Sequence, residues 1–182
     1  MRPVFRERHG GLQDPLNIRG SNGPLQGLPK RIFRNVFSYA IPGGHAKNAV
    51  LRGVFEGWTL RSIVGWRAGI PLNVTSGNDF VGNGRAAGQR PDAVTGVDPY
   101  VRNHETQVWL TAAAFDVNAL RTARRFGNLG YFALRGPSAF TMDAGLHKTF
   151  TLQERHKVTL RLEAFNALNH TTLGNPNTTL NN

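Results

Sequence analysis

The sequence predicts an all-β protein built from antiparallel, up-and-down strands. Four stretches alternate with a period of two between large apolar residues and small or polar residues. This pattern is typical of strands whose two faces meet different environments. No uninterrupted apolar run reaches the roughly 18 residues that a transmembrane helix requires. The chain also carries 21 Gly and 10 Pro, which favours a turn-rich β protein over a helical one.

The first predicted strand covers residues 31–41. Its apolar face carries Phe33, Phe37, Tyr39 and Ile41, interrupted by Asn35. The opposite face is mixed, because Arg34, Ser38 and Ala40 share it with two aliphatic residues.

The second predicted strand, residues 58–68, has a tryptophan near each end of its apolar face, at Trp58 and Trp66. The strand between them is roughly 26 Å long, and a tilt of about 40–45° reduces this to roughly 20 Å along the membrane normal. This is close to the separation of the two aromatic girdles of an outer-membrane β-barrel. A buried strand of a soluble sandwich is the alternative explanation for the two tryptophans.

The third and fourth predicted strands, residues 140–152 and 158–164, are separated only by the charged residues 153–157. They are therefore expected to form a hairpin with a tight turn. Lys148 is the one charge on the apolar face of the third strand. A lysine near a strand end can extend its amine to water, so this charge does not exclude a lipid-facing surface.

The segment between the second and third strands is rich in Gly and Pro and is too long for an ordinary loop of a compact domain. Short helices are expected within residues 111–124. The shorter connection 42–57 has one-turn helical spacing at Val50, Leu51, Val54 and Phe55, but a packed connector is the preferred interpretation. Short turns at one end and a long loop at the other are typical of outer-membrane barrels.

The predicted organisation has five segments, which follow the chain in order. They are an irregular N-terminal segment (1–30), barrel strands with a periplasmic connection (31–72), a long extracellular loop (73–137), a barrel strand hairpin (138–168) and a truncated loop (169–182).

Charged residues within the strands lie opposite the apolar residues, as expected for a wall between lipid and an aqueous lumen. We expect the charged residues to approach one another across neighbouring strands, with arginines near the two carboxylates. The predicted lumen-facing residues are Arg34, Arg61, Arg67, Asp143, His147, Arg161 and Glu163. The predicted lipid-facing residues are Phe37, Trp58, Trp66, Phe140, Leu146, Phe150, Leu160 and Leu162.

A formal net charge of +11 and a pI near 11.4 support a rival hypothesis. This is a soluble basic β domain that binds polyanions such as nucleic acid or polysaccharide. However, the densest clusters of basic residues contain only a few residues each. The aromatic residues of the strands lie mostly on the same face as aliphatic residues and not beside arginines. A nucleic-acid platform would place aromatic and basic residues together. Specific nucleic-acid binding is therefore not expected.

No pattern of residues indicates catalysis. The six histidines lack metal-site spacing, the glycines of residues 82–88 do not fit a dinucleotide fingerprint, and no serine lies in a nucleophile elbow. Cysteine is absent, which excludes thiol catalysis. We expect no enzyme activity, no cofactor and no metal.

Several blocks in a fixed order resemble Oar-like TonB-dependent receptors, over about residue 14 to the C-terminus. The strongest block is the last strand with its continuation. The blocks are GWTLRSI (57–63), AGIPLNVTSG (68–77), RPD (90–92), WLTAAAF (109–115), FGNLG (126–130), LRGP (134–137), LRLEAFNALNH (160–170) and GNPN (174–177).

The resemblance implies an outer-membrane transporter of roughly 22 strands with an internal plug, which imports bulky nutrients with energy delivered through TonB. Outer-membrane lipid, lipopolysaccharide and the remainder of the receptor are the implied partners. The plug, the TonB-binding region and a closing strand do not match any part of this sequence. We therefore expect an incomplete barrel, that is, a fragment of the receptor wall.

Overall fold

The computed structural model describes residues 12–43, 48–84, 88–101, 108–152 and 156–180. Contacts divide the chain into two units. The sheet unit consists of residues 31–68 and 138–173, and the loop unit consists of residues 1–30, 69–137 and 174–182. The chain therefore passes between the units at four points.

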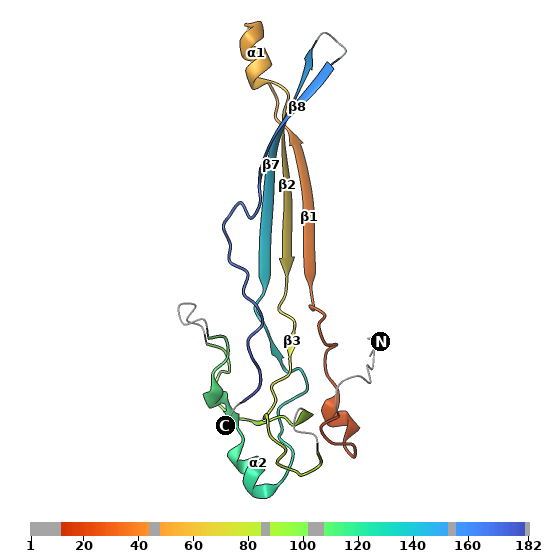
Figure 1. The fold of residues 1–182 in the computed structure, drawn as a ribbon, viewed down its shortest axis with the longest axis vertical. Coiled ribbons are helices and arrows are strands. Elements are labelled where there is room, and N and C mark those ends of the chain that lie inside the picture. Colours follow the sequence, from red (N-terminus) through yellow and green to blue (C-terminus); the bar gives the residue numbers. More distant parts are fainter. Residues whose placement is uncertain (1–11, 44–47, 85–87, 102–107, 153–155, 181–182) are drawn as a thin grey trace. The chain divides into compact units, whose positions relative to one another are not determined.

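The sheet unit contains four long antiparallel strands in the order β1-β2-β7-β8 (Figure 1). The fold class and all four predicted strands are confirmed. The sheet is not closed, because β1 and β8 form its two edges. The strands are β1 (Ile32–Ala40), β2 (Trp58–Arg67), β7 (Ala139–Leu152) and β8 (His156–Ala164).

The strand register aligns most of the apolar residues of the four strands on one side of the sheet. One row runs Tyr39, Leu60, Leu146 and Leu162 from β1 to β8. Because side chains alternate along a strand, one such row determines the face of every other residue. We call the side that carries this row the apolar face and the opposite side the polar face.

The strands are staggered as well as paired. Strand β7 pairs with β2 over residues 139–148, but with β8 over residues 144–152. Such a stagger accompanies the tilt of strands in a barrel wall.

The predicted hairpin is confirmed, since β7 and β8 are antiparallel and pair up to Leu152 and His156. Strand β8 begins at His156, two residues before the predicted start at Val158. The reason is that His156 and Lys157 continue the ladder although neither is apolar. Of the predicted turn 153–157, residues 153–155 lie outside the described residues.

The connection between β1 and β2 contains helix α1 (Ala49–Phe55), at the same end of the sheet as the β7–β8 hairpin (Figure 1). The prediction of a packed connector is wrong, because Leu51, Val54 and Phe55 are exposed. The helix lies beyond the ends of β1 and β2 (Figure 1). In the described part of the chain, no helix is both long and apolar enough to cross a membrane.

Two asparagines shape the turn that ends β8. Asn166 and Asn169 both have a left-handed backbone with φ 48°, which asparagine tolerates better than most residues. The Asn166 side chain accepts a hydrogen bond from the His170 amide (3.0 Å) and donates one to the His170 carbonyl (3.2 Å). The backbone amide of Ala167 donates to the Met142 carbonyl (2.7 Å), so the chain stays attached to β7 after the strand ends.

The loop unit consists of short elements. The short helices predicted within 111–124 are confirmed by η4 and α2. Two pairs of two-residue strands, β3 with β6 and β4 with β5, bring distant segments together. The elements are η1 (Ile18–Ser21), β3 (Pro71–Leu72), β4 (Asp92–Ala93), η4 (Ala112–Ala114), β5 (Phe115–Asp116), α2 (Asn118–Ala123) and β6 (Leu134–Arg135).

A small core holds the loop unit together. It is formed by Leu72, Val74, Leu129 and Leu134, with the rings of Tyr100 and Trp109 packed against it. The Trp109 indole donates to the Arg135 carbonyl (2.9 Å), and the Tyr100 hydroxyl accepts from the Arg135 amide (3.0 Å). The segment predicted as one long loop is therefore a packed structure.

Asp92 joins three segments of the loop unit. Its carboxylate accepts two hydrogen bonds from Arg125 (3.0 and 2.5 Å) and one from the Asn128 amide (2.9 Å). The hydrogen bonds from Arg125 lower the pKa of Asp92, although burial opposes them. A carboxyl whose pKa is lowered in the folded state contributes stability above its ordinary pKa, and this is lost as the pH falls through the lowered value.

We therefore expect the loop unit to lose stability in acid, and Asp92→Asn to remove most of this pH dependence while lowering stability at neutral pH. Denaturant unfolding from pH 7 to pH 2 measures both, followed by Trp109 fluorescence in a chain that carries Trp58→Phe and Trp66→Phe. Coincident pH profiles of the wild type and Asp92→Asn would contradict the assignment.

Candidate functional site: the two faces of the sheet

The register separates the two predicted sets of residues completely. All seven predicted lumen-facing residues lie on the polar face, and all eight predicted lipid-facing residues lie on the apolar face. The polar face carries Arg34, Arg61, Arg67, Asp143, His147, Arg161 and Glu163. The apolar face carries Phe37, Trp58, Trp66, Phe140, Leu146, Phe150, Leu160 and Leu162.

The expected pairing of arginines with carboxylates on the polar face is not found. The residues Ser38, Arg61, Gly145 and Glu163 form one row across the sheet. Gly145 lies between Arg61 and Glu163 in this row and has no side chain. Neighbouring strands are about 4.8 Å apart, so Arg61 and Glu163 start roughly 10 Å from each other. Among the described residues, no ion pair joins an arginine of this face to Asp143 or Glu163.

The two carboxylates have other partners. Glu163 lies 3.6 Å from the Nε2 atom of His147, a pair that is ionic only when the histidine is protonated. Asp143 accepts a hydrogen bond from the Asn166 amide (2.9 Å), in the turn that follows β8. The arginines thus give the polar face its positive charge.

Aromatic residues mark both ends of the apolar face. The row nearest the loop-unit connections contains Phe33, Trp66 and Phe140 on three adjacent strands. Trp58 and Phe150 lie toward the opposite end. This is the arrangement of two aromatic girdles that border an apolar band.

The apolar face has no second layer within the sheet unit. Phe37, Trp66, Leu160 and Leu162 are all exposed, and Leu146 is half-buried. A monomer in water rarely leaves so many large apolar side chains uncovered on one surface. The sheet therefore requires an apolar environment on this face.

One polar residue of the apolar face is satisfied internally. The Ser62 hydroxyl donates to the backbone carbonyl of Asp143 (3.0 Å) on the adjacent strand. A hydroxyl that is hydrogen-bonded to the backbone is much less costly to place in lipid than a free one.

Lys148 does not extend to water as the sequence suggested. Its side chain is only 3% exposed, and its amine donates to the Val54 carbonyl of α1 (2.6 Å). The amine also lies over the rings of Trp58 (5.0 Å) and Phe150 (4.9 Å). The expectation failed because the Val54 carbonyl of α1 lies within hydrogen-bond distance of the amine. The sequence did not predict a helix at this position.

Lys148 and Trp58 together fasten α1 to the sheet, since the Trp58 indole donates to the same Val54 carbonyl (2.8 Å). Cations and other donors are favourable at a helix C-terminus, where the backbone carbonyls lack partners. Sequence reasoning missed this role. The only signal in the sequence was a lysine, Lys148, within the apolar alternation of the third predicted strand.

These features define the wall of an outer-membrane β-barrel: antiparallel staggered strands, an exposed apolar face with aromatic borders, and a charged face opposite. Residues 5–182 match the family described as outer membrane beta barrel domain, and the chain belongs to that family. The protein is accordingly located in the outer membrane. No curated protein and no solved structure matches the chain.

Proposed function

We propose that this chain forms part of the barrel wall of a TonB-dependent, Oar-like receptor that imports bulky nutrients across the outer membrane. The observation that carries the proposal is the strand register, which places most large apolar residues of the strands on one face. It places Arg34, Arg61, Arg67, Asp143, His147, Arg161 and Glu163 on the other face. The family match supports a barrel wall, and the ordered sequence blocks support the receptor class.

The two faces have different roles in this proposal. The apolar face contacts outer-membrane lipid and lipopolysaccharide, and the polar face lines the lumen. The arginines at 34, 61, 67 and 161 make the lumen positive along this part of the wall. The chain acts as a scaffold and permeation surface, without catalytic residues and without a cofactor.

The orientation follows from connectivity. Strands β1, β2 and β7 join the loop unit at the end of the sheet defined by Ile32, Arg67 and Ala139, which are paired with one another. Long connections of outer-membrane barrels are extracellular and short ones are periplasmic. The loop unit therefore faces outward, and α1 faces the periplasm. The edges β1 and β8 pair with further strands of the receptor, because open edges are not tolerated in lipid.

The uptake function is tested in the native host by deleting the gene segment that encodes β7 and β8. We expect uptake of at least one bulky solute to be abolished, and wild-type uptake of that solute to be abolished by a protonophore. Deletion of an equally long segment from an unrelated outer-membrane protein is the control. Protonophore-sensitive uptake that the deletion leaves intact for every solute would contradict the proposal.

Lipid contact of the apolar face is expected to appear in tryptophan fluorescence. In bilayers with brominated acyl chains, quenching should fall when Trp66 is replaced by Phe, because Trp66 is exposed on the apolar face. Trp109→Phe is the matched control, since Trp109 packs in the loop unit core. Equal loss of quenching in both variants would argue against a lipid-facing Trp66.

Binding of nucleic acid should be weak and non-specific, since the positive charge of the chain would act only through counterion release. We expect affinity in a filter-binding titration to fall steeply with salt. Tight, sequence-selective binding that persists at about 0.2 M salt would instead favour a soluble polyanion-binding domain.

A further inference from the structure

The apolar face of the sheet extends past the ends of β1 and β2. Strand β7 continues beyond Lys148, the last residue that pairs with β2, and there it pairs with β8 alone. We call this part of the hairpin the overhang. Phe150 and Val158 are paired with each other on the apolar face of the overhang, and both are exposed. At this level β1 and β2 have already ended, at Ala40 and Trp58.

Helix α1 carries a second apolar surface at the same end of the sheet (Figure 1). Leu51, Val54 and Phe55 are spaced by three and four residues, which places them on one side of an α-helix. Their side chains are 46%, 51% and 62% exposed. We call these three residues the apolar stripe of α1. The stripe therefore needs an apolar partner outside the sheet unit.

Two hydrogen bonds place the end of α1 on the apolar side of the sheet. The Val54 carbonyl accepts from the Lys148 amine (2.6 Å) and from the Trp58 indole (2.8 Å). Lys148 and Trp58 are paired with each other on the apolar face. The Lys148 amine also lies 4.9 Å from the centre of the Phe150 ring, at the base of the overhang. The apolar stripe thus begins where the apolar face of β1 and β2 ends.

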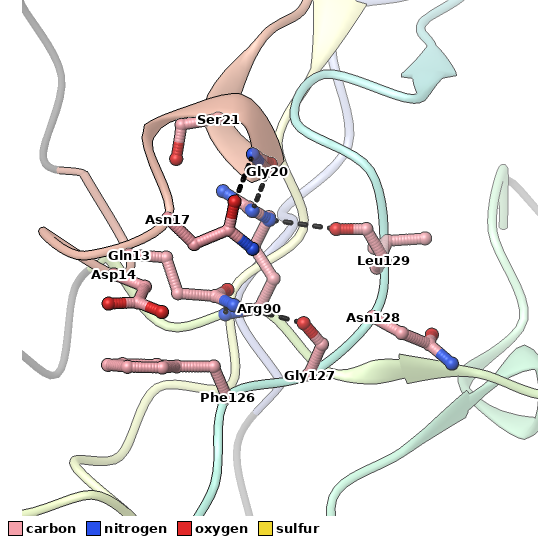
Figure 2. A pocket seen from close by; sticks show the side chains of 10 residues that line it. All are labelled: Gln13, Asp14, Asn17, Gly20, Ser21, Arg90, Phe126, Gly127, Asn128 and Leu129. Carbon is pink, nitrogen blue, oxygen red and sulfur yellow. Dashed lines mark hydrogen bonds between the residues drawn. The ribbon is translucent and has the colours of Figure 1, made fainter.

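The charge of Lys148 explains why the helix is held there. Lys148 and Arg90 are the two buried cations of the described residues, and each is 3% exposed. Arg90 donates to the Gly20 and Leu129 carbonyls of the loop unit (Figure 2). Lys148 instead lies on the face that meets lipid, where a cation without an acceptor is costly. The Val54 carbonyl supplies this acceptor, so α1 stays beside the strands.

We propose that α1 is an interfacial helix, whose apolar stripe inserts between the headgroups and acyl chains of the adjacent lipid leaflet. Helices of this kind bury their apolar side by about 5–10 Å. With 7 residues, α1 is about 10 Å long, so the whole stripe fits within this boundary. The inference rests on the lipid-facing apolar face of the proposed function, but not on nutrient uptake. By the orientation given above, the leaflet is the periplasmic one.

Continuity with the aromatic girdle favours lipid over a protein partner. Trp58 and Phe150 belong to the girdle at this end of the apolar face, and girdle residues lie at the level of the headgroups. Because Trp58 is hydrogen-bonded to α1 itself, the helix lies at the same level. The apolar stripe and the overhang then meet one lipid surface.

The test uses the full chain, which contains no cysteine, with a polarity-sensitive fluorophore on a single introduced cysteine. Leu51→Cys and Phe55→Cys are labelled and reconstituted in vesicles whose acyl chains are brominated near the headgroups. We expect both labels to emit at shorter wavelength than in water and to lose fluorescence relative to vesicles without bromine. Gly53→Cys is the matched control, because residue 53 lies on the opposite side of α1 and a Cβ atom there meets nothing within 4 Å. Its label should emit as in water and be quenched least.

Phe37→Cys separates a failure of this inference from a failure of the proposed function, since Phe37 lies in the middle of the apolar face. Quenching at position 37 with water-like emission at 51 and 55 would overturn the interfacial helix alone and leave its stripe to a protein partner. Equal quenching at 51, 53 and 55 would also overturn it, because the helix would then have no wet side. No quenching at 37 would overturn the lipid-facing assignment and this inference with it.

Discussion

Replacing Phe37 by arginine is expected to destabilise the protein in a lipid bilayer by about 2–4 kcal/mol, the cost of an arginine on the lipid face near the midplane. Phe37 is paired with Ser62, whose row lies midway between those of Trp58 and Trp66. The arginine would replace an exposed ring and would be too far from either interface for complete hydration.

Val36→Arg is the matched control, because the adjacent residue points to the polar face and is also an exposed apolar residue of β1. Here the new charge would meet the lumen, and the change in stability should stay within about 0.5 kcal/mol, as is typical of surface substitutions. Denaturant unfolding from bilayers, followed by loss of β signal in circular dichroism, gives both values. Similar losses for the two variants would refute the assignment of the faces.

Gly69→Ala is expected to destabilise the loop unit by about 1–3 kcal/mol, as for other substitutions that force atoms into a filled space. A Cβ atom at Gly69 would collide with the backbone carbonyl of Gly136. The backbone cannot yield as a side chain does, so β3 and β6 would separate. The hydrogen bond from the Gly136 amide to the Ile70 carbonyl (2.9 Å) would then be lost.

Amide hydrogen exchange at Leu72 and Leu134 measures this effect directly, because both residues belong to the loop unit core. Gly174→Ala is the control, since a Cβ atom there would meet nothing within 4 Å. Faster exchange in Gly69→Ala alone supports the packing described, whereas protection equal to that of the wild type would contradict it.

The four strands could be predicted from the sequence because each has a two-residue period that decides which face a side chain occupies. If the alternation had been assigned one residue out of step, the two faces would have been exchanged. This error did not occur, because Trp66, Phe140 and Leu162 all lie on the expected side. The hairpin followed from the short spacing between the third and fourth stretches.

The loop unit could not be predicted in the same way. Its strands, such as Pro71–Leu72 and Leu134–Arg135, contain two residues each and therefore have no periodicity. Their pairing depends on contacts between residues far apart in the sequence. Arg90 illustrates the problem, since nothing near it in the sequence indicates that carbonyls of Gly20 and Leu129 will surround it.

The candidate site was predictable in its division into faces but less so in its charge contacts. Alternation placed Arg61 and Glu163 on one face, but only the register shows that Gly145 lies between them. The role of Lys148 likewise depends on α1. The apolar spacing in this segment covers only one helical turn, which was not enough to predict a helix.

The stagger of β7 has a consequence for how the sheet comes apart. Residues 144–148 are the part of β7 that is hydrogen-bonded to both neighbours, whereas residues on either side of this stretch are paired with one neighbour only. Loss of β2 and loss of β8 would therefore both remove hydrogen bonds from the same five residues of β7. Either edge strand can peel away while the central β2–β7 ladder persists, so β2 and β7 are the last pair to separate.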